Sequence, residues 1–262
     1  MPYYRRVGEV PRKRHSRFPR PDGGLFAEEL MGEDGFSSES SLLYHAHPPT
    51  ALLAAEAVTE PSPCLVDNLP LLPRHLRTHD LAPAGDLVSG RRLLLANHDV
   101  RILAAAVVEP SGLYRDAAGD ELVYLESGTA RLESVFGTLV AGSGDYVVIP
   151  AGTTHRWIPE GGGPVRALIL EAGGHIRPPR RYLSAEGQFL EHAPYSERDL
   201  RGPAALTAGE GEAEVLVRQR GGLTRYTYRH HPFDVVGWDG CLYPYAFSIH
   251  DFEPLVKRFH AP

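Results

Sequence analysis

Two residues of this chain, Glu121 and His155, have types and a spacing that suit metal chemistry. A carboxylate and an imidazole are both ordinary ligands of divalent metal ions. Gly128 follows Glu121 by seven residues, and Pro150 and Gly152 come shortly before His155. Glycine suits a turn that needs φ > 0, and proline fixes φ and cannot continue a strand ladder. The pattern predicts two strands, each with a turn beside it and a metal-ligand type of residue on it.

This spacing resembles the two motifs of the cupin family. Residues 146–149 between the turns form an apolar, β-branched run that predicts a strand. The resemblance implies an all-β fold, a double-stranded β-helix or jelly-roll barrel. It also implies that Glu121 and His155 lie on adjacent strands and point inward, where a non-haem metal normally binds.

The resemblance is incomplete at the positions that matter most for a metal. Cupin sites generally use two further histidines, six and four residues before the glutamate, and this chain has Arg115 and Ala117 there. A guanidinium stays protonated and cannot donate a lone pair to a metal. We therefore expect Glu121 and His155 to be residual, non-binding positions in a barrel kept as scaffold, with Arg115 pairing with Glu121. The alternative is metal binding inside this barrel.

Composition narrows the function classes. The chain has 262 residues and a formal net charge of −6, which argues against general nucleic-acid binding. Residues 1–20 are nonetheless basic and carry prolines and aromatics, which predicts an extended arm along the domain or a neighbouring subunit. Cys64 and Cys241 make no disulfide framework, and no apolar run is long enough for a membrane span. We expect a cytoplasmic protein that binds neither nucleic acid nor membrane.

Strand-like patterns divide the chain into three predicted parts. Residues 1–80 form an irregular N-terminal arm, in which the Ala- and Leu-rich stretch 50–58 suggests a helix after Pro49. Residues 81–175 have the rhythm of a β-barrel, the cupin that lacks a complete metal site. Residues 176–262 hold additional strands and a connector toward a second cupin that we expect to be absent from this chain.

Other histidines offer weaker candidates for chemistry. His45 and His47 have the His-x-His spacing that places two imidazoles on one face of a strand, but they precede Pro48-Pro49 in an irregular region. A docking contact is the favoured interpretation there. His75 and His79 are four residues apart in a stretch too short for a stable helix. No nucleophile elbow, phosphate loop or dinucleotide fingerprint is present, so hydrolase and nucleotide-binding functions have no support.

Several blocks together resemble the homogentisate 1,2-dioxygenase family of two-cupin, iron-dependent enzymes that cleave aromatic rings. The most specific block is Pro-Phe-Asp-Val-Val-Gly-Trp at 232–238, followed by His-Asp-Phe-Glu-Pro at 250–254. The other matching segments are residues 12–18, 43–49, 119–122 and 144–155.

The resemblance implies an Fe(II)-dependent extradiol-type dioxygenase of tyrosine and phenylalanine catabolism. Its substrates would be O₂ and a small aromatic carboxylate, and its assembly a trimer or hexamer. In the family the iron ligands lie in the second cupin, so we expect this chain to end before the iron site, to hold no Fe(II) and to be inactive alone. His260 best matches a proton-accepting histidine of the family. Two alternatives remain open, a non-catalytic cupin scaffold or ligand-binding protein and a gentisate-like dioxygenase.

Aromatic and histidine residues near the end of the chain are expected to make contacts rather than do chemistry. The resemblance implies that Trp238, Tyr243 and Tyr245 build the packing between the two cupins. Interface roles are also expected for His230, His231 and His250.

Overall fold

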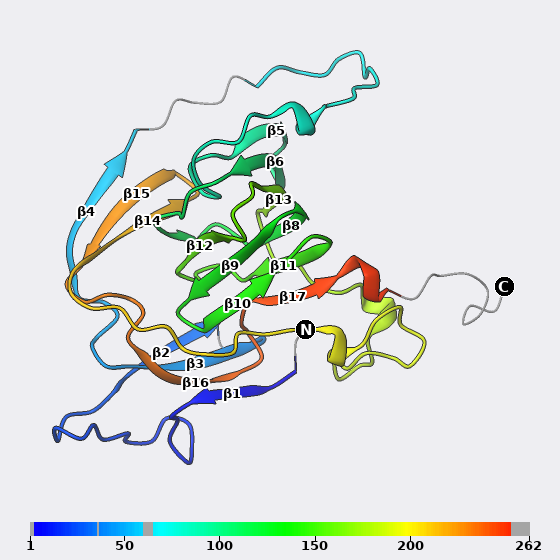
Figure 1. Ribbon diagram of the computed structural model, residues 1–262. Helices are drawn as coiled ribbons and strands as arrows, with labels where there is room; N and C mark the ends of the chain where they lie inside the picture. The colour runs from blue at the N-terminus through cyan, green and yellow to red at the C-terminus, as the bar shows by residue number, and fades with distance from the viewer. Residues whose placement is uncertain (1–2, 36, 60–64, 253–262) are drawn as a thin grey trace.

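The computed structural model describes residues 3–35, 37–59 and 65–252, and this part of the chain is built almost entirely of strands (Figure 1). The helical elements within it are short 3-10 turns, and none is long and apolar enough to cross a membrane. The strands are β1 (Arg5–Gly8), β2 (Ala27–Gly32), β3 (Ser40–His45), β4 (Leu52–Val58), β5 (Arg92–Ala96), β6 (Val100–Val107), β7 (Leu113–Asp116), β8 (Glu121–Ser127), β9 (Thr129–Ser134), β10 (Gly137–Ala141), β11 (Asp145–Ile149), β12 (His155–Glu160), β13 (Val165–Ala172), β14 (Ala213–Gln219), β15 (Gly222–Tyr228), β16 (Val235–Gly240) and β17 (Tyr245–Ser248). The 3-10 turns are η1 (Thr78–Asp80), η2 (Arg180–Tyr182), η3 (Glu197–Asp199) and η4 (Ile249–Asp251).

The barrel is made by two sheets that share one apolar core. One sheet has the order β17-β11-β8-β13-β6-β5, and the other β10-β9-β12-β7-β14-β15-β4. Leu125 and Ile169 from the first sheet and Leu132 and Trp157 from the second are fully buried in one cluster between them. β13 alternates strictly between buried and half-buried residues, as a strand with one face on a core must. The expected all-β cupin fold is confirmed.

The turns predicted from the motif glycines are also present. Gly128 and Gly152 have φ of +85° and +83°. A Cβ at Gly128 would lie 2.8 Å from the Pro164 carbonyl oxygen, so this turn needs glycine for space as well as for φ. β11 ends at Ile149, directly before Pro150. These turns fix where β8 and β12 present their side chains.

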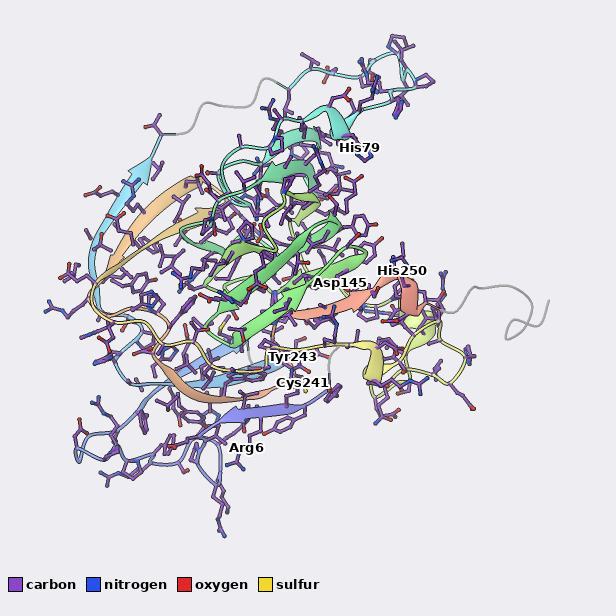
Figure 2. All side chains as sticks on the ribbon, viewed as in Figure 1. Arg6, His79, Asp145, Cys241, Tyr243 and His250 are labelled. Atoms are coloured by element: carbon purple, nitrogen blue, oxygen red, sulfur yellow. The ribbon has the colours of Figure 1, made fainter. Side chains whose placement is uncertain are left out.

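A third sheet, β1-β16-β3-β2, joins the N-terminal region to the end of the described chain. β1 runs antiparallel to β16, and Tyr243 donates a hydrogen bond to the Tyr3 carbonyl oxygen at 2.7 Å. Figure 2 shows Arg6, Cys241 and Tyr243 together in this part of the molecule. This portion of the basic arm therefore lies along its own domain.

A second apolar core packs against the third sheet. Trp238 is fully buried there and donates a hydrogen bond to the Phe136 carbonyl oxygen at 2.8 Å. Tyr243 and Tyr245 belong to the same cluster. Within the described residues these three aromatics pack inside the chain, and their role against a second cupin stays a prediction.

The expected helix at residues 50–58 is wrong. Residues Leu52–Val58 form β4, which pairs antiparallel with β15 at the edge of the seven-stranded sheet. Alanine and leucine favour helices only weakly, and hydrogen bonding to an available strand outweighs that preference. The three predicted ranges, 1–80, 81–175 and 176–262, remain predictions. The described residues of the first range contain four strands, β1 to β4.

Candidate functional site

The predicted pair Glu121 and His155 does meet inside the barrel. Glu121 Oε2 lies 3.6 Å from His155 Nε2, and both side chains are almost completely buried. Glu121 lies on β8 and His155 on β12, which belong to the two facing sheets. The expectation that they lie on adjacent strands is wrong. The neighbour of Glu121 in the ladder is Glu171 on β13, which brings a second carboxylate to the same place.

The cation between these carboxylates is Arg91. Its Nη1 donates to Glu121 Oε1 in a short contact and to Glu171 Oε1 at 2.8 Å. Its Nε donates to the Leu87 carbonyl oxygen at 2.6 Å, and its guanidinium lies 5.3 Å from the centre of the Tyr114 ring. The Arg91 side chain is only 5% exposed. Arg91 thus fills the polar centre of the barrel.

A turn at residues 86–91, which we call the plug, holds Arg91 in place. Asp86 Oδ1 accepts hydrogen bonds from the backbone amides of Val88 and Ser89, and Gly90 N donates to the Asp86 carbonyl oxygen. Leu87 of the plug is buried in the barrel core. Two side chains therefore hold the plug in the barrel, the apolar Leu87 and the charged Arg91.

The expected pairing of Arg115 with Glu121 is wrong. Arg115 Nε and Nη2 donate to Thr154 Oγ1 at 2.8 and 2.6 Å, and its guanidinium lies over the Tyr228 ring. Side chains alternate along β7, so its neighbours Tyr114 and Asp116 point into the barrel and Arg115 points to the other face. Asp116 is engaged by Arg218 in a short ion pair.

The protonation states inside the barrel follow from burial and charge. Burial lowers the pKa of His155 to about 4, so the imidazole is neutral at pH 7. His155 Nδ1 lies 3.0 Å from the Thr153 carbonyl oxygen and must donate to it, which leaves a lone pair on Nε2. Burial and the charge of Glu121 raise the pKa of Asp116 to about 6. Burial opposes the charge on Arg91, but Glu121 and Glu171 outweigh it and raise the pKa of this guanidinium.

The residues of the barrel do not fit a bound iron. A metal held by Glu121 and His155 would have to share the space between the two carboxylates with the Arg91 guanidinium, a fixed positive charge with no lone pair to donate. The positions 115 and 117 supply no imidazole. We therefore assign no chemical step to a metal in this barrel.

The barrel opens to solvent beside the plug. A cavity of about 200 Å³ is bordered by Arg91, Tyr114 and Glu171 and by two arginines at its rim, Arg101 and Arg218. Arg101 pairs with Glu171 Oε2 at 2.8 Å, and its side chain is 32% exposed. Three arginines and one carboxylate, Glu171, therefore line this opening.

A second charged cluster joins the N-terminal strands to the segment before β16. His45 on β3 contacts Asp234 Oδ1 through Nδ1 at 2.6 Å and Glu29 Oε2 through Nε2 at 3.0 Å. Burial opposes its charge, yet the hydrogen bonds to Asp234 and Glu29 raise the pKa of His45 to about 9. Both nitrogens therefore donate, and His45 is a charged structural residue rather than a metal ligand.

His47 lies at the exposed edge of the same cluster. Its backbone amide donates to Asp234 Oδ2 at 2.8 Å, and its ring stacks on that of His230 at 3.9 Å between centroids. His45 and His47 thus both contact Asp234, a partner that their own spacing does not reveal. The docking contact expected for the pair is here a contact within the chain.

A third cluster, Glu33, Asp120 and His175, places one potential ligand atom of each residue within 4.8 Å of the others. Sequence reasoning missed it, because no motif connects residues so far apart in the chain. Arg177 donates to both Glu33 oxygens, and backbone amides of Ala151 and Ile176 donate to Asp120 at 2.8 Å. The carboxylates of Glu33 and Asp120 are therefore already hydrogen-bonded, which does not favour a bound cation at this cluster.

The remaining predicted residues divide into placed and unplaced ones. His231 Nδ1 accepts a hydrogen bond from Phe233 N at 3.0 Å, and His79 on η1 pairs with Glu126 at 2.9 Å. His250 is exposed on η4, and Figure 2 shows where His79 and His250 lie. His260, the candidate proton acceptor, and Cys64 lie outside the described residues.

Comparison with known proteins decides the family. Residues 76–249 match the family model described as homogentisate 1,2-dioxygenase N-terminal. The chain belongs to this family. The match runs from just before η1 into η4 and includes the plug, β16 and the strands of the two barrel sheets except β4.

Relatives of known name agree with this assignment. A provisionally assigned dioxygenase of Saccharolobus solfataricus is 36% identical over 100% of this chain and 68% of its own length. Homogentisate 1,2-dioxygenases of Rhodopseudomonas palustris (strain BisA53) and Emericella nidulans are 28% and 27% identical over 88% of this chain. The chain spans 55% of the length of each of these two enzymes.

Similarity to solved structures is limited to part of the chain. Hydroquinone 1,2-dioxygenase from Sphingomonas sp. TTNP3 is 18% identical, covers 38% of this chain and 74% of its own, and has a TM-score of 0.30. A cupin-2 domain protein from Shewanella frigidimarina covers 31% of this chain with a TM-score of 0.29.

Proposed function

We propose that this chain supplies the first cupin and the N-terminal arm of a ring-cleaving dioxygenase that acts on homogentisate or a close relative. The observation that carries the proposal is the match of residues 76–249 to the N-terminal family model. The reaction would consume O₂ and a small aromatic carboxylate, in the cytoplasm and in a trimer or hexamer. The catalytic Fe(II) would be held by residues that these 262 do not include.

The contacts inside the barrel support a structural role for this chain and a catalytic role for residues outside it. Arg91, Glu121 and Glu171 compensate one another at the centre of the barrel, where a substrate-binding metal would otherwise need open positions. The contribution of this chain is therefore structural: a rigid barrel, and a third sheet that ties the arm to β16. The same observation favours a second candidate, a non-catalytic cupin scaffold.

Oxygen uptake tests the proposal. The purified 262-residue chain with Fe(II) and homogentisate should consume no more O₂ than an iron blank. If the coding sequence continues beyond codon 262, a frame that encodes His-x5-Glu and a later His favours the enzyme, and a stop codon favours the scaffold. The longer product should then cleave homogentisate faster than gentisate. Turnover by the 262-residue chain that disappears in His155→Ala would overturn the assignment of the iron to other residues.

A further inference from the structure

The cavity beside the plug has both charged and apolar walls. It lies between the two barrel sheets, because β6 and β13 of one sheet and β7, β14 and β15 of the other all contribute to it. The charged groups are three guanidiniums and the single carboxylate of Glu171. The apolar side chains are Val88, Leu103, Leu216 and Leu223. Such a lining suits a ligand that carries a negative charge and an apolar group.

We propose that this cavity binds a small organic monoanion, a carboxylate whose apolar body is the size of one ring. Its volume sets the size of the ligand. A dry apolar cavity of about 150 Å³ is large enough to hold benzene. The volume here is about 200 Å³, which leaves room for a carboxylate beside the ring. The proposal depends on the cavity and not on the activity proposed above.

The charges around the cavity favour an anion with a single charge. Three positive groups and one negative group line the cavity, and a lining of this sign attracts an anion. Two further carboxylates, those of Asp116 and Glu121, do not line it but pair with two of the arginines. The three arginines and three carboxylates together sum to zero, so a second negative charge on the ligand would meet net repulsion.

Glu171 holds the two rim arginines in place for such a ligand. Its Oε2 lies 2.8 Å from Arg101 Nη1 and 3.5 Å from Arg218 Nη1, and its side chain is only 3% exposed. Arg218 Nη1 also contacts Asp116. Within the described residues these ion pairs all use Nη1, so Nε and Nη2 of both guanidiniums remain as donors for a carboxylate. A ligand therefore need not displace Glu171.

Arg91 contributes a further donor to the same cavity. Its side chain lines the cavity, and its Nη2 is buried with no hydrogen-bond partner in the part of the chain that the structure describes. A buried donor without an acceptor is costly, so a carboxylate that reaches Arg91 from the cavity would gain a charge-assisted hydrogen bond. Tyr114, whose ring lies 5.3 Å from this guanidinium, adds an aromatic wall beside it.

Benzoate binding to the purified 262-residue chain, with no iron added, tests the proposal. Isothermal titration should show one site with a Kd of about 1 mM or lower. Benzamide keeps the ring without the charge, and acetate keeps the charge without the ring. Each should bind at least about 10-fold more weakly than benzoate. Absence of saturable benzoate binding, or equal binding of either analogue, would overturn the proposal and leave the oxygen-uptake test unaffected.

Substitutions locate the bound benzoate. Arg101→Met removes a rim donor but leaves Glu171 paired with Arg91, so benzoate should bind at least about 10-fold more weakly to a folded protein. Arg92→Met, at an exposed arginine of β5 outside the cavity, is the matched control and should bind as wild type does. Leu223→Trp fills the apolar side and keeps all three arginines, and it should weaken binding as well.

The two cavity variants keep the test decisive if one of them folds poorly. Circular dichroism identifies the variant that is folded, and its affinity for benzoate then decides the outcome. Weaker binding by a folded Arg101→Met or Leu223→Trp, with unchanged binding by Arg92→Met, supports the site. Unchanged binding by a folded cavity variant would show that benzoate binds elsewhere, and the proposal would be wrong.

Discussion

Two regions of this molecule bury a cation between two carboxylates, and they do so in different ways. In the barrel the cation is the Arg91 guanidinium, which stays charged at every pH below about 12. In the cluster before β16 it is the His45 imidazole between Glu29 and Asp234, whose charge depends on pH. The barrel thus holds a permanent charge and the His45 cluster a titratable one.

The two regions meet across β7. Tyr114 and Asp116 face the barrel, and Arg115 between them faces Thr154 and the pocket that also contains His45 and Asp234. A single strand with period 2 therefore separates the two sets of charges. The comparison teaches that the Arg91 and His45 centres lie on opposite faces of β7, so substitutions can test each centre separately.

The largest effect is expected from Arg91→Met. The variant leaves Glu121 buried without its cation and removes one of the cations beside Glu171, which keeps Arg101, so the free energy of unfolding should fall by about 3–5 kcal/mol. Chemical denaturation at pH 7 measures this loss. Arg92→Met, at the exposed neighbouring position on β5, is the matched control and should change little. Similar losses in both variants would contradict the role given to Arg91.

A smaller, pH-dependent loss is expected from His45→Gln. The folded-state pKa of His45, about 9, lies above its ordinary value of 6.5, so the charged imidazole stabilises the fold fully below pH 6.5. That contribution, on the order of 2–3 kcal/mol, should disappear as the pH rises through 9. Although burial opposes ionisation, His45 lowers the pKa of Asp234 and of Glu29, so acid should weaken the cluster too. Denaturation of both proteins from pH 5 to 10 measures the difference, and a constant difference would rule out a titrating His45.

Sequence patterns predicted the barrel well, because turn glycines and strand alternation are local. They placed Glu121 and His155 together, although on facing sheets rather than adjacent strands. They missed Arg91 and Glu171, which reach the same centre from segments that carry no motif. Spacing alone assigned Arg115 to the barrel, but which face a strand turns inward depends on the register that tertiary packing selects. In the same way, the pairing of β4 with β15 overrode the helix preference of residues 50–58.

Arg115→Met tests the separation of the two faces. The variant loses the hydrogen bonds to Thr154 and the contact with the Tyr228 ring, so the free energy of unfolding should fall by about 1 kcal/mol. In a double-mutant cycle with Glu121→Gln, the two losses should add, because Arg115 does not pair with Glu121. A coupling energy above about 1 kcal/mol would mean that Arg115 reaches the barrel after all.

The smallest effect is expected from His47→Ala, at the exposed edge of the His45 cluster. The backbone amide of His47 still donates to Asp234, so the variant loses only the ring contact with Asp234 at 3.1 Å and the stack on His230. The His47 side chain is 41% exposed, and the loss should stay below about 1 kcal/mol. His230→Ala and the double variant complete a cycle that isolates the stack. A loss as large as that of His45→Gln would show that the stacked His47 and His230 rings, and not His45 alone, stabilise the charged Asp234 carboxylate.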